Sequence, residues 1–110
     1  KKNIPLLGIC RGMQMIANHF KSKIVKKKNH IGDHEINFLF TKKKIKVNSF
    51  HNYAVIKLGN ALKPIAIAND QTYEAFKHKT KKILGIMWHP ERYKKIKKID
   101  VDLIIKYLCN

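Results

Sequence analysis

The stretch IPLLGICRGMQMIANHF, residues 4–20, decides the interpretation of this 110-residue chain. Its first six residues form a continuous apolar run, which is typical of a strand buried on both faces of a parallel sheet. Apolar side chains then recur at helical spacing from Met13 to Phe20, so we predict a helix over residues 11–20. A buried strand that runs directly into a helix favours an α/β fold.

Outward from this stretch, most of the chain has the pattern of strands. We predict strands over residues 36–40, 44–47, 53–58, 64–68, 73–76 and 83–88. Asn69 and Asp70 form a turn signal between the fourth and fifth of these strands, which indicates a hairpin. Residues 83–88 form a second strand of the buried type. An amphipathic helix over residues 100–108 follows it, with Asp100 as the expected N-cap.

Composition favours one small folded domain, or a piece of a larger one. Hydrophobic residues make up 45% of the chain, and no apolar run reaches the roughly 18 to 20 residues that a membrane span needs. The start of the chain does not resemble a signal peptide. Two cysteines, Cys10 and Cys109, do not make a disulfide framework. We therefore expect a cytoplasmic, reduced protein without a membrane partner.

The charge is strongly positive, with 24 basic and 7 acidic residues and a formal net charge of +17. Lysine supplies almost all of it, because Arg11 and Arg92 are the only arginines. Proteins that bind nucleic acid favour arginine, which contacts phosphate and guanine with two hydrogen bonds. The field is therefore expected to attract an anionic small-molecule substrate rather than a nucleic acid.

Residues 8–12 have the form Gly-x-Cys-x-Gly, the cysteine version of a nucleophile elbow. Such a turn strains the backbone of the nucleophile and needs small neighbours, which Gly8 and Gly12 provide. The start of the helix favours the thiolate of Cys10, and the backbone N–H of Arg11 can donate to an oxyanion. The alternative is a buried structural cysteine in a glycine-flanked turn.

A second chemical feature, Trp88-His89-Pro90-Glu91, follows the second buried strand. A thiol nucleophile needs a base, and the base needs a group that orients it. Residues two apart in extended backbone point the same way, so Glu91 can bond one imidazole nitrogen of His89 while the other faces the nucleophile. A histidine after an apolar strand is common by itself. Together with the elbow, it predicts a catalytic set of Cys10, His89 and Glu91.

Three segments in this order resemble the class I glutamine amidotransferases: residues 5–14 (PLLGICRGMQ), 47–52 (VNSFHN) and 85–91 (GIMWHPE). An arginine after the nucleophile is typical of the γ-glutamyl hydrolase branch of that family. Residues 48–53 and 88–92 are similar to the γ-glutamyl-CDP-amidate hydrolases of capsule phosphoramidate biosynthesis. The resemblance implies a flavodoxin-like α/β sandwich.

The resemblance also implies a role for each matching residue. Cys10 would attack a γ-glutamyl carbonyl and form a thioester, His89 would move the protons, and Glu91 would orient His89. The implied substrate-binding residues are Arg11, Gln14, Asn48, Ser49, Phe50 and His51. Among these, Gln14 would hold the glutamyl group, and His51 stands where many members have the first residue of a His-Gln pair. No cofactor is implied.

Members of this family carry further strands before the elbow, with a glycine that supplies a second oxyanion donor. We therefore expect residues 1–110 to be the C-terminal part of a single domain of this type, with the N-terminal strands missing. The family also tends to have Gly-Gly after the elbow helix, where this chain has Lys21-Ser22.

Two other functions stay open beside a γ-glutamyl hydrolase. One is a glutaminase subunit that supplies ammonia to a synthetase partner. The other is a non-catalytic basic module that binds polyanions. A metal site is not expected, because Gly32 between His30 and His34 predicts a loop and no third ligand is evident.

Overall fold

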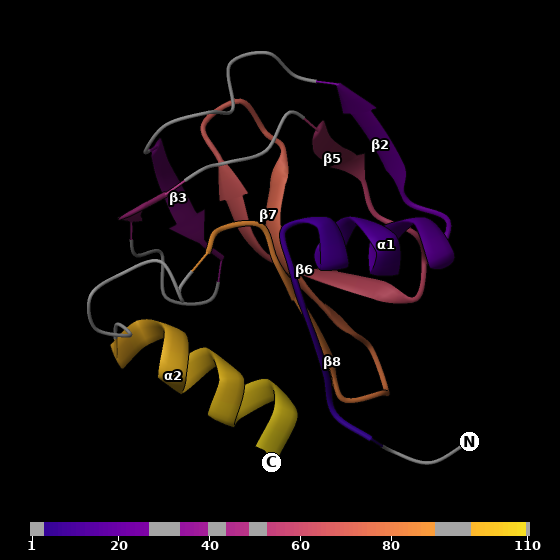
Figure 1. Cartoon of the computed structure of the whole chain (residues 1–110). Helices are drawn as coiled ribbons and strands as arrows, with labels where there is room; N and C mark the ends of the chain where they lie inside the picture. The colour runs from indigo at the N-terminus through magenta and orange to yellow at the C-terminus, as the bar shows by residue number, and fades with distance from the viewer. Residues whose placement is uncertain (1–3, 27–33, 40–43, 49–52, 90–97, 110) are drawn as a thin grey trace.

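The computed structural model describes residues 4–26, 34–39, 44–48, 53–89 and 98–109. The elements are β1 (Leu6–Ile9), α1 (Arg11–His19), β2 (Lys23–Lys26), β3 (His34–Phe38), β4 (Lys44–Val47), β5 (Tyr53–Lys57), β6 (Leu62–Ala68), β7 (Tyr73–His78), β8 (Ile83–Ile86), α2 (Lys98–Ile104) and a terminal π-helical turn, η2 (Ile105–Cys109). Figure 1 shows α1 and α2 on different sides of the strands.

The strands form one branched sheet in the order β1-β8-β7-β6-β3-β4. Strands β1 and β8 are parallel, with Leu6 opposite Ile83 and Ile9 opposite Ile86. The other pairings are antiparallel, and β5 branches off by pairing with both β2 and β7. A parallel pair joined to an antiparallel sheet, with helices packed against it, confirms the α/β prediction.

Successive side chains along β8 and the residue after it point to opposite faces of the sheet and enter two different hydrophobic cores. Leu84 and Ile86 belong to the core that includes Leu103 and Leu108 of the C-terminal helical segment. Met87 belongs to the other core, which includes Met13 of α1. A Cβ on Gly85 would come within 2.9 Å of Met13 Cγ, so this glycine lets α1 approach the sheet closely. The end of β8 is thereby held between two packed layers.

Several predicted elements are confirmed with small changes of boundary. The β6–β7 hairpin forms, and its turn is closed by hydrogen bonds from Thr72 to the Asp70 carboxylate. Strand β2 was not predicted. The expectation that Asp100 caps the last helix is wrong, because α2 begins at Lys98 and Asp100 lies buried in its first turn.

The turn between β7 and β8 is organised by a buried histidine. His78 Nδ1 accepts hydrogen bonds from the backbone N–H groups of Thr80 and Lys81, at 3.1 and 3.0 Å. Its ring also packs edge-on against Phe20. Burial lowers the pKa of His78 below 6.5, and the nearby charges of Lys81 and Lys77 lower it further. The ring is therefore neutral in the folded protein at neutral pH, with its proton on Nε2.

We expect this histidine to make stability depend on pH. Because its pKa is lower in the folded state, the unfolded chain takes up a proton first as the pH falls below about 6.5. The contribution of His78 is thus complete above that pH and is lost as the pH falls toward the folded-state pKa. Urea unfolding between pH 7.5 and 5 should show a steeper loss for the wild type than for His78→Gln. Parallel curves for the two proteins would contradict the prediction.

Candidate active site

The nucleophile turn joins β1 to α1 with a strained cysteine. Cys10 is the N-cap of α1 and has φ 52° and ψ −103°, a left-handed backbone that a residue with a side chain rarely adopts. Its N–H donates to the Ile86 carbonyl at 2.8 Å, and its own carbonyl accepts from the Gln14 N–H at 3.0 Å. These bonds connect the strained residue to the end of β8 and to the first turn of α1.

The first turn of α1 provides a positive environment beside the thiol. Arg11 is the first helical residue, so its backbone N–H belongs to the four that have no acceptor within the helix. The first turn contains no acidic residue, and the Arg11 side chain is exposed. The helix dipole and this arginine both favour an anion at Cys10, either a thiolate or an oxyanion beside it.

The glycine on the strand side of the turn is required by packing. A Cβ on Gly8 would lie 2.8 Å from the carbonyl carbon and oxygen of Gly12 and 2.5 Å from Ile16 Cδ1. A Cβ on Gly12 would meet nothing within 4 Å among the described residues. The expectation that both glycines must be small is therefore confirmed for Gly8 and wrong for Gly12.

This difference predicts opposite effects for two matched substitutions. Gly8→Ala is expected to lower the free energy of unfolding by about 1–3 kcal/mol, because backbone must move to admit the methyl group. Gly12→Ala is expected to leave stability unchanged or raise it by up to about 1 kcal/mol, since alanine favours helix. Chemical denaturation of both variants tests the pair, and equal losses would contradict it.

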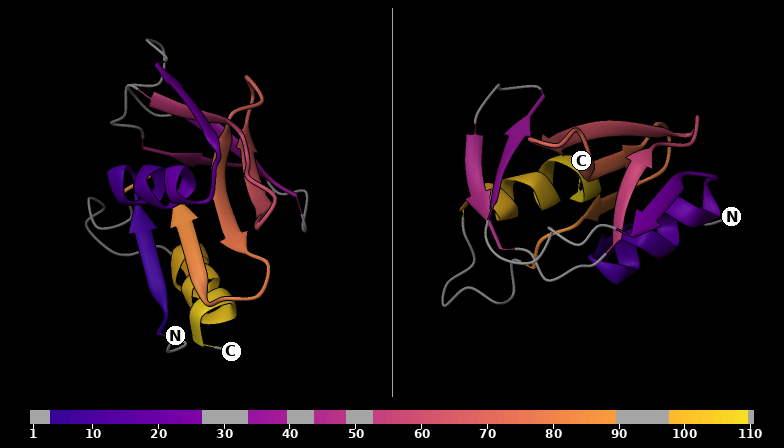
Figure 2. Two further views of the ribbon diagram at one scale, coloured as in Figure 1. Left: turned by 90° about the vertical axis from the view of Figure 1, so that its right-hand side faces the viewer. Right: turned by 90° about the horizontal axis from the view of Figure 1, so that it is seen from above.

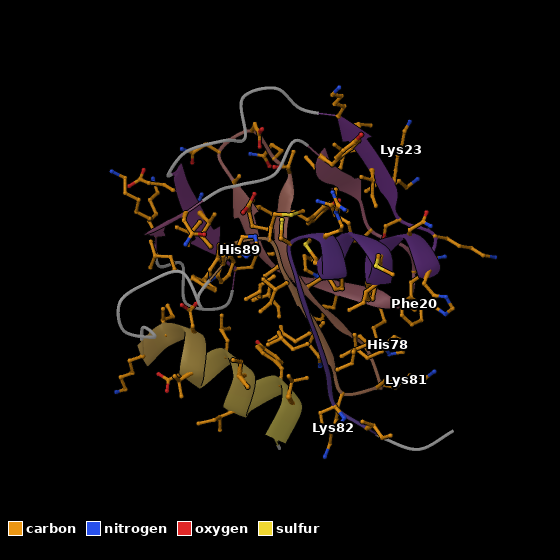
Figure 3. All side chains as sticks on the ribbon, in the orientation of Figure 1. Phe20, Lys23, His78, Lys81, Lys82 and His89 are labelled. Carbon is orange, nitrogen blue, oxygen red and sulfur yellow. The ribbon has the colours of Figure 1, made fainter. Side chains whose placement is uncertain are left out.

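The predicted base lies at the same edge of the sheet as the nucleophile. Because β1 and β8 are parallel neighbours with Ile9 opposite Ile86, their carboxyl ends lie side by side beneath α1 (Figure 2, left view). Cys10 follows β1 directly, and His89 comes three residues after the end of β8. Figure 3 shows His89 at this edge, where α1 begins. The imidazole is half-buried, as a group with access to substrate must be.

Two of the other predicted residues also reach this edge. Gln14 Nε2 lies 3.6 Å from Met87 Sδ, so the side chain of α1 extends over the end of β8. Asn48, which follows β4, bonds the backbone of His89 through both its Nδ2 and its Oδ1. The sequence motif placed Asn48 beside substrate but gave no sign of this contact with His89.

The remaining predicted site residues, Ser49, Phe50, His51 and Glu91, lie outside the described residues. So does His30, the first histidine of the pair at residues 30 and 34. Within the described ranges, no cluster of three or more His, Cys, Asp or Glu side chains could hold a metal ion. The same ranges contain no helix that is long and apolar enough to cross a membrane.

A buried bond that sequence reasoning missed fixes the residue before His89. The Trp88 indole N–H donates to Asp100 Oδ1 at 2.8 Å, and both side chains are almost fully buried. Trp88 also packs edge-on against Phe38 of β3. Helix α2 is thereby bonded to the segment that carries the predicted base. In the sequence, this bond was signalled only by a tryptophan twelve residues before an aspartate in a predicted helix.

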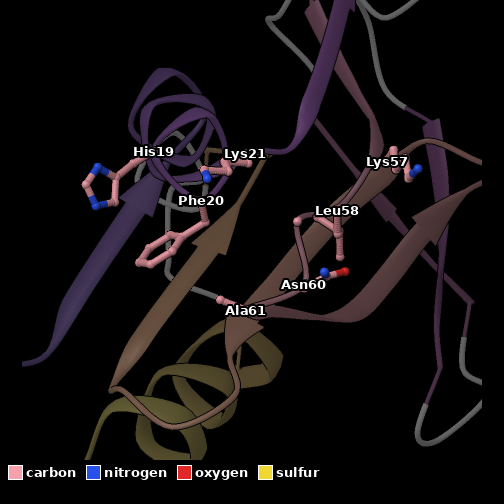
Figure 4. Close-up of a pocket in the computed structure, with 8 residues that line it drawn as sticks. His19, Phe20, Lys21, Lys57, Leu58, Asn60 and Ala61 are labelled. Carbon is pink, nitrogen blue, oxygen red and sulfur yellow. The ribbon is translucent and has the colours of Figure 1, made fainter.

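A separate hollow of about 430 Å³ lies at the opposite end of α1, and Figure 4 shows residues that line it. His19, Phe20 and Lys21 form one side, and residues 57–61 form the other. Gly59 is required there, because a Cβ would overlap the Phe20 carbonyl oxygen. The nine residues of α1 span about 13 Å at the rise of an α-helix, so the hollow at its far end is distinct from the candidate site.

Comparison with known proteins gives a consistent result. The family model described as glutamine amidotransferase class-I matches residues 1–101. The chain is 52% identical over 101 residues to the γ-glutamyl-CDP-amidate hydrolase of Campylobacter jejuni. The aligned region covers 92% of this chain and 50% of that protein. It is 33% identical over 97 residues to a glutamine-hydrolyzing GMP synthase subunit of Thermococcus kodakarensis, covering 81% of this chain and 52% of that protein. The chain thus spans about half the length of each of these two relatives.

Solved structures agree on the fold. A protein of Thermoplasma acidophilum, provisionally named as a subunit of GMP synthase, superposes with a TM-score of 0.81 at 28% identity, over 98% of this chain and 57% of that one. A glutamine amidotransferase of Thermotoga maritima gives a TM-score of 0.70 at 23% identity, over 81% of this chain and 41% of that one. The expected α/β sandwich of this type is thereby confirmed.

Proposed function

Because this chain belongs to the class I glutamine amidotransferase family, we propose that it carries the nucleophile and base of an enzyme that hydrolyses a γ-glutamyl C–N bond. The observation that carries the proposal is the strained Cys10 turn between β1 and α1. Its N–H is bonded to the last residue of β8, three residues before His89. The strain stored at a capping cysteine with φ 52° has no evident structural benefit and is typical of a functional site.

The proposed reaction has two steps. The Cys10 thiolate attacks the γ-carbonyl carbon and forms a thioester as the C–N bond breaks, and His89 donates a proton to the leaving nitrogen. His89 then takes a proton from water, whose oxygen attacks the thioester carbon. Glutamate leaves, and Cys10 regains its thiolate. The Arg11 N–H stabilises the oxyanion in both steps, and Glu91 orients the imidazole.

For the substrate, we propose an anionic γ-glutamyl compound such as γ-glutamyl-CDP-amidate, in which the leaving nitrogen is attached to phosphorus. The 52% identity to a hydrolase of that name supports this choice. A net charge of +17 also suits a substrate that carries phosphate groups. On this proposal the protein acts in capsule biosynthesis, and residues 1–110 form the C-terminal part of its amidotransferase domain.

A second candidate is a glutaminase that supplies ammonia to a synthetase partner. The 33% identity to the GMP synthase subunit of Thermococcus kodakarensis supports it. The chemistry at Cys10 is the same, but the substrate is glutamine and the activity should rise when the synthetase binds. Strong partner-free turnover of a γ-glutamyl nucleotide, with little turnover of glutamine, would exclude this second candidate.

Covalent labelling tests the proposed nucleophile without knowledge of the leaving group. The protein as its gene encodes it is treated with a diazo-ketone analogue of glutamine, and its intact mass is measured. We expect a single adduct that is absent from Cys10→Ala and retained in Cys109→Ala. No adduct on folded protein with titratable thiols would overturn the proposal and favour a basic module that binds polyanions.

A further inference from the structure

The backbone of His89 is held by a side chain from a distant part of the chain. Asn48 follows β4, the strand at the opposite end of the sheet order from β1, and lies 41 residues from His89 in sequence. Its Nδ2 donates to the His89 carbonyl at 2.8 Å, and its Oδ1 accepts from the His89 N–H at 2.7 Å. One carboxamide thus bonds both polar groups of the same residue, as a neighbouring strand would.

This contact occurs where the pairing of β8 ends. The last β8 residue in register with β1 is Ile86, and the Met87 N–H still bonds the Glu74 carbonyl of β7. At His89 the two backbone groups bond Asn48 instead. The Asn48 side chain is 7% exposed, so water does not compete freely for these bonds.

We infer that Asn48 is a positioning residue that acts through His89, rather than a residue that binds substrate. This inference rests on the proposed function, because it assigns His89 as the base. Bonding both the N–H and the carbonyl restricts the dihedral angles on each side of the His89 Cα, and these angles set where the imidazole points. A displacement of about 1 Å in a reacting group can cost on the order of 100-fold in rate.

Asn48→Asp and Asn48→Ala disrupt the contact in two different ways. Aspartate keeps an oxygen that accepts from the His89 N–H but replaces the donor with an oxygen that repels the His89 carbonyl. Alanine removes both bonds. We expect kcat for the γ-glutamyl substrate to fall by about 10- to 100-fold in both variants, with KM changed by less than about threefold. Asn60→Asp, the same change on an exposed asparagine, is the control and should leave both parameters unchanged.

A double-variant cycle distinguishes action through the imidazole from a general structural role. The measured quantity is the rate of Cys10 alkylation by iodoacetamide across pH, followed by peptide mass, in the wild type, Asn48→Ala, His89→Ala and the double variant. We expect the midpoint of the pH profile to rise in Asn48→Ala and more in His89→Ala. The double variant should match His89→Ala, because Asn48 then has no imidazole to position.

Two outcomes would overturn the inference. In the first, Asn48→Ala shifts the midpoint of the alkylation pH profile equally in the wild-type and His89→Ala backgrounds, which is the behaviour of a structural residue. The other is a raised KM with unchanged kcat, which would return Asn48 to the substrate-binding role that the motif indicated. Alkylation requires no γ-glutamyl substrate, so failure of the proposed reaction and failure of this inference give different results.

Discussion

Replacing Cys10 with alanine is expected to reduce glutamate release from a γ-glutamyl nucleotide by about 10⁴-fold or more. Without the sulfur no thioester can form, and only binding and oxyanion contacts remain to assist the attack of water. The measurement is glutamate release under saturating substrate, by the protein as its gene encodes it. Cys109→Ala changes the other cysteine of the sequence and should keep full activity.

His89→Ala should reduce glutamate release nearly as much as Cys10→Ala does. The double variant should lose no more activity than Cys10→Ala alone. Residues that act as one unit give non-additive losses, since the base has no function without its nucleophile. Losses that multiply in the double variant would show that the two side chains act separately. That result would contradict a shared thioester mechanism even if each single variant were inactive.

The backbone strain at Cys10 also predicts a difference in stability between two inactive variants. A left-handed backbone at a residue with a Cβ costs on the order of 1–3 kcal/mol, and glycine adopts it without a steric penalty. Cys10→Gly is therefore expected to be more stable than Cys10→Ala by about 1 kcal/mol, with both inactive. Equal stability would indicate that the turn relaxes when the thiol is removed.

Local pattern was sufficient to predict the nucleophile turn and the parallel pair. Continuous apolar runs at residues 4–9 and 83–88 predicted β1 and β8, and such runs differ visibly from the alternation of a half-exposed strand. The expected burial is confirmed for most of β8 but is wrong for β1, because Leu6 is 48% exposed and only Gly8 in that strand is buried. Strand β2 could not be predicted in this way. It contains two apolar residues between lysines, and its conformation depends on pairing with β5 rather than on its own sequence.

The two long-range contacts around the base could not be predicted for a related reason. Asn48 is part of a recognisable motif, but its bonds to His89 join segments 41 residues apart and depend on how β4 is placed. Asp100 has the composition of an N-cap, yet α2 starts two residues earlier and the carboxylate is needed by Trp88. Tertiary packing overrides a local capping preference when a buried donor requires an acceptor.

Removing the Trp88 side chain is expected to give the largest loss of stability among the substitutions considered. Trp88 has no exposed surface, packs edge-on against Phe38, and donates its indole N–H to Asp100. Trp88→Ala should lower the free energy of unfolding by about 3–5 kcal/mol, the usual cost of deleting a buried aromatic side chain. Trp88→Phe keeps most of the packing but loses the donor, so we expect a loss of about 1–3 kcal/mol.

A matched pair of aspartates on α2 isolates the hydrogen bond from the packing. Asp100 is buried and accepts from Trp88, whereas Asp102 on the same helix is exposed. Asp100→Ala should cost about 1–3 kcal/mol because the indole N–H loses its acceptor in a buried site. Asp102→Ala should stay within about 0.5 kcal/mol of the wild type. Because α2 is bonded to the residue before His89, Asp100→Ala should also lower kcat more than Asp102→Ala does. Equal stability and activity in the two alanine variants would mean that the Trp88–Asp100 bond neither holds α2 nor supports the base.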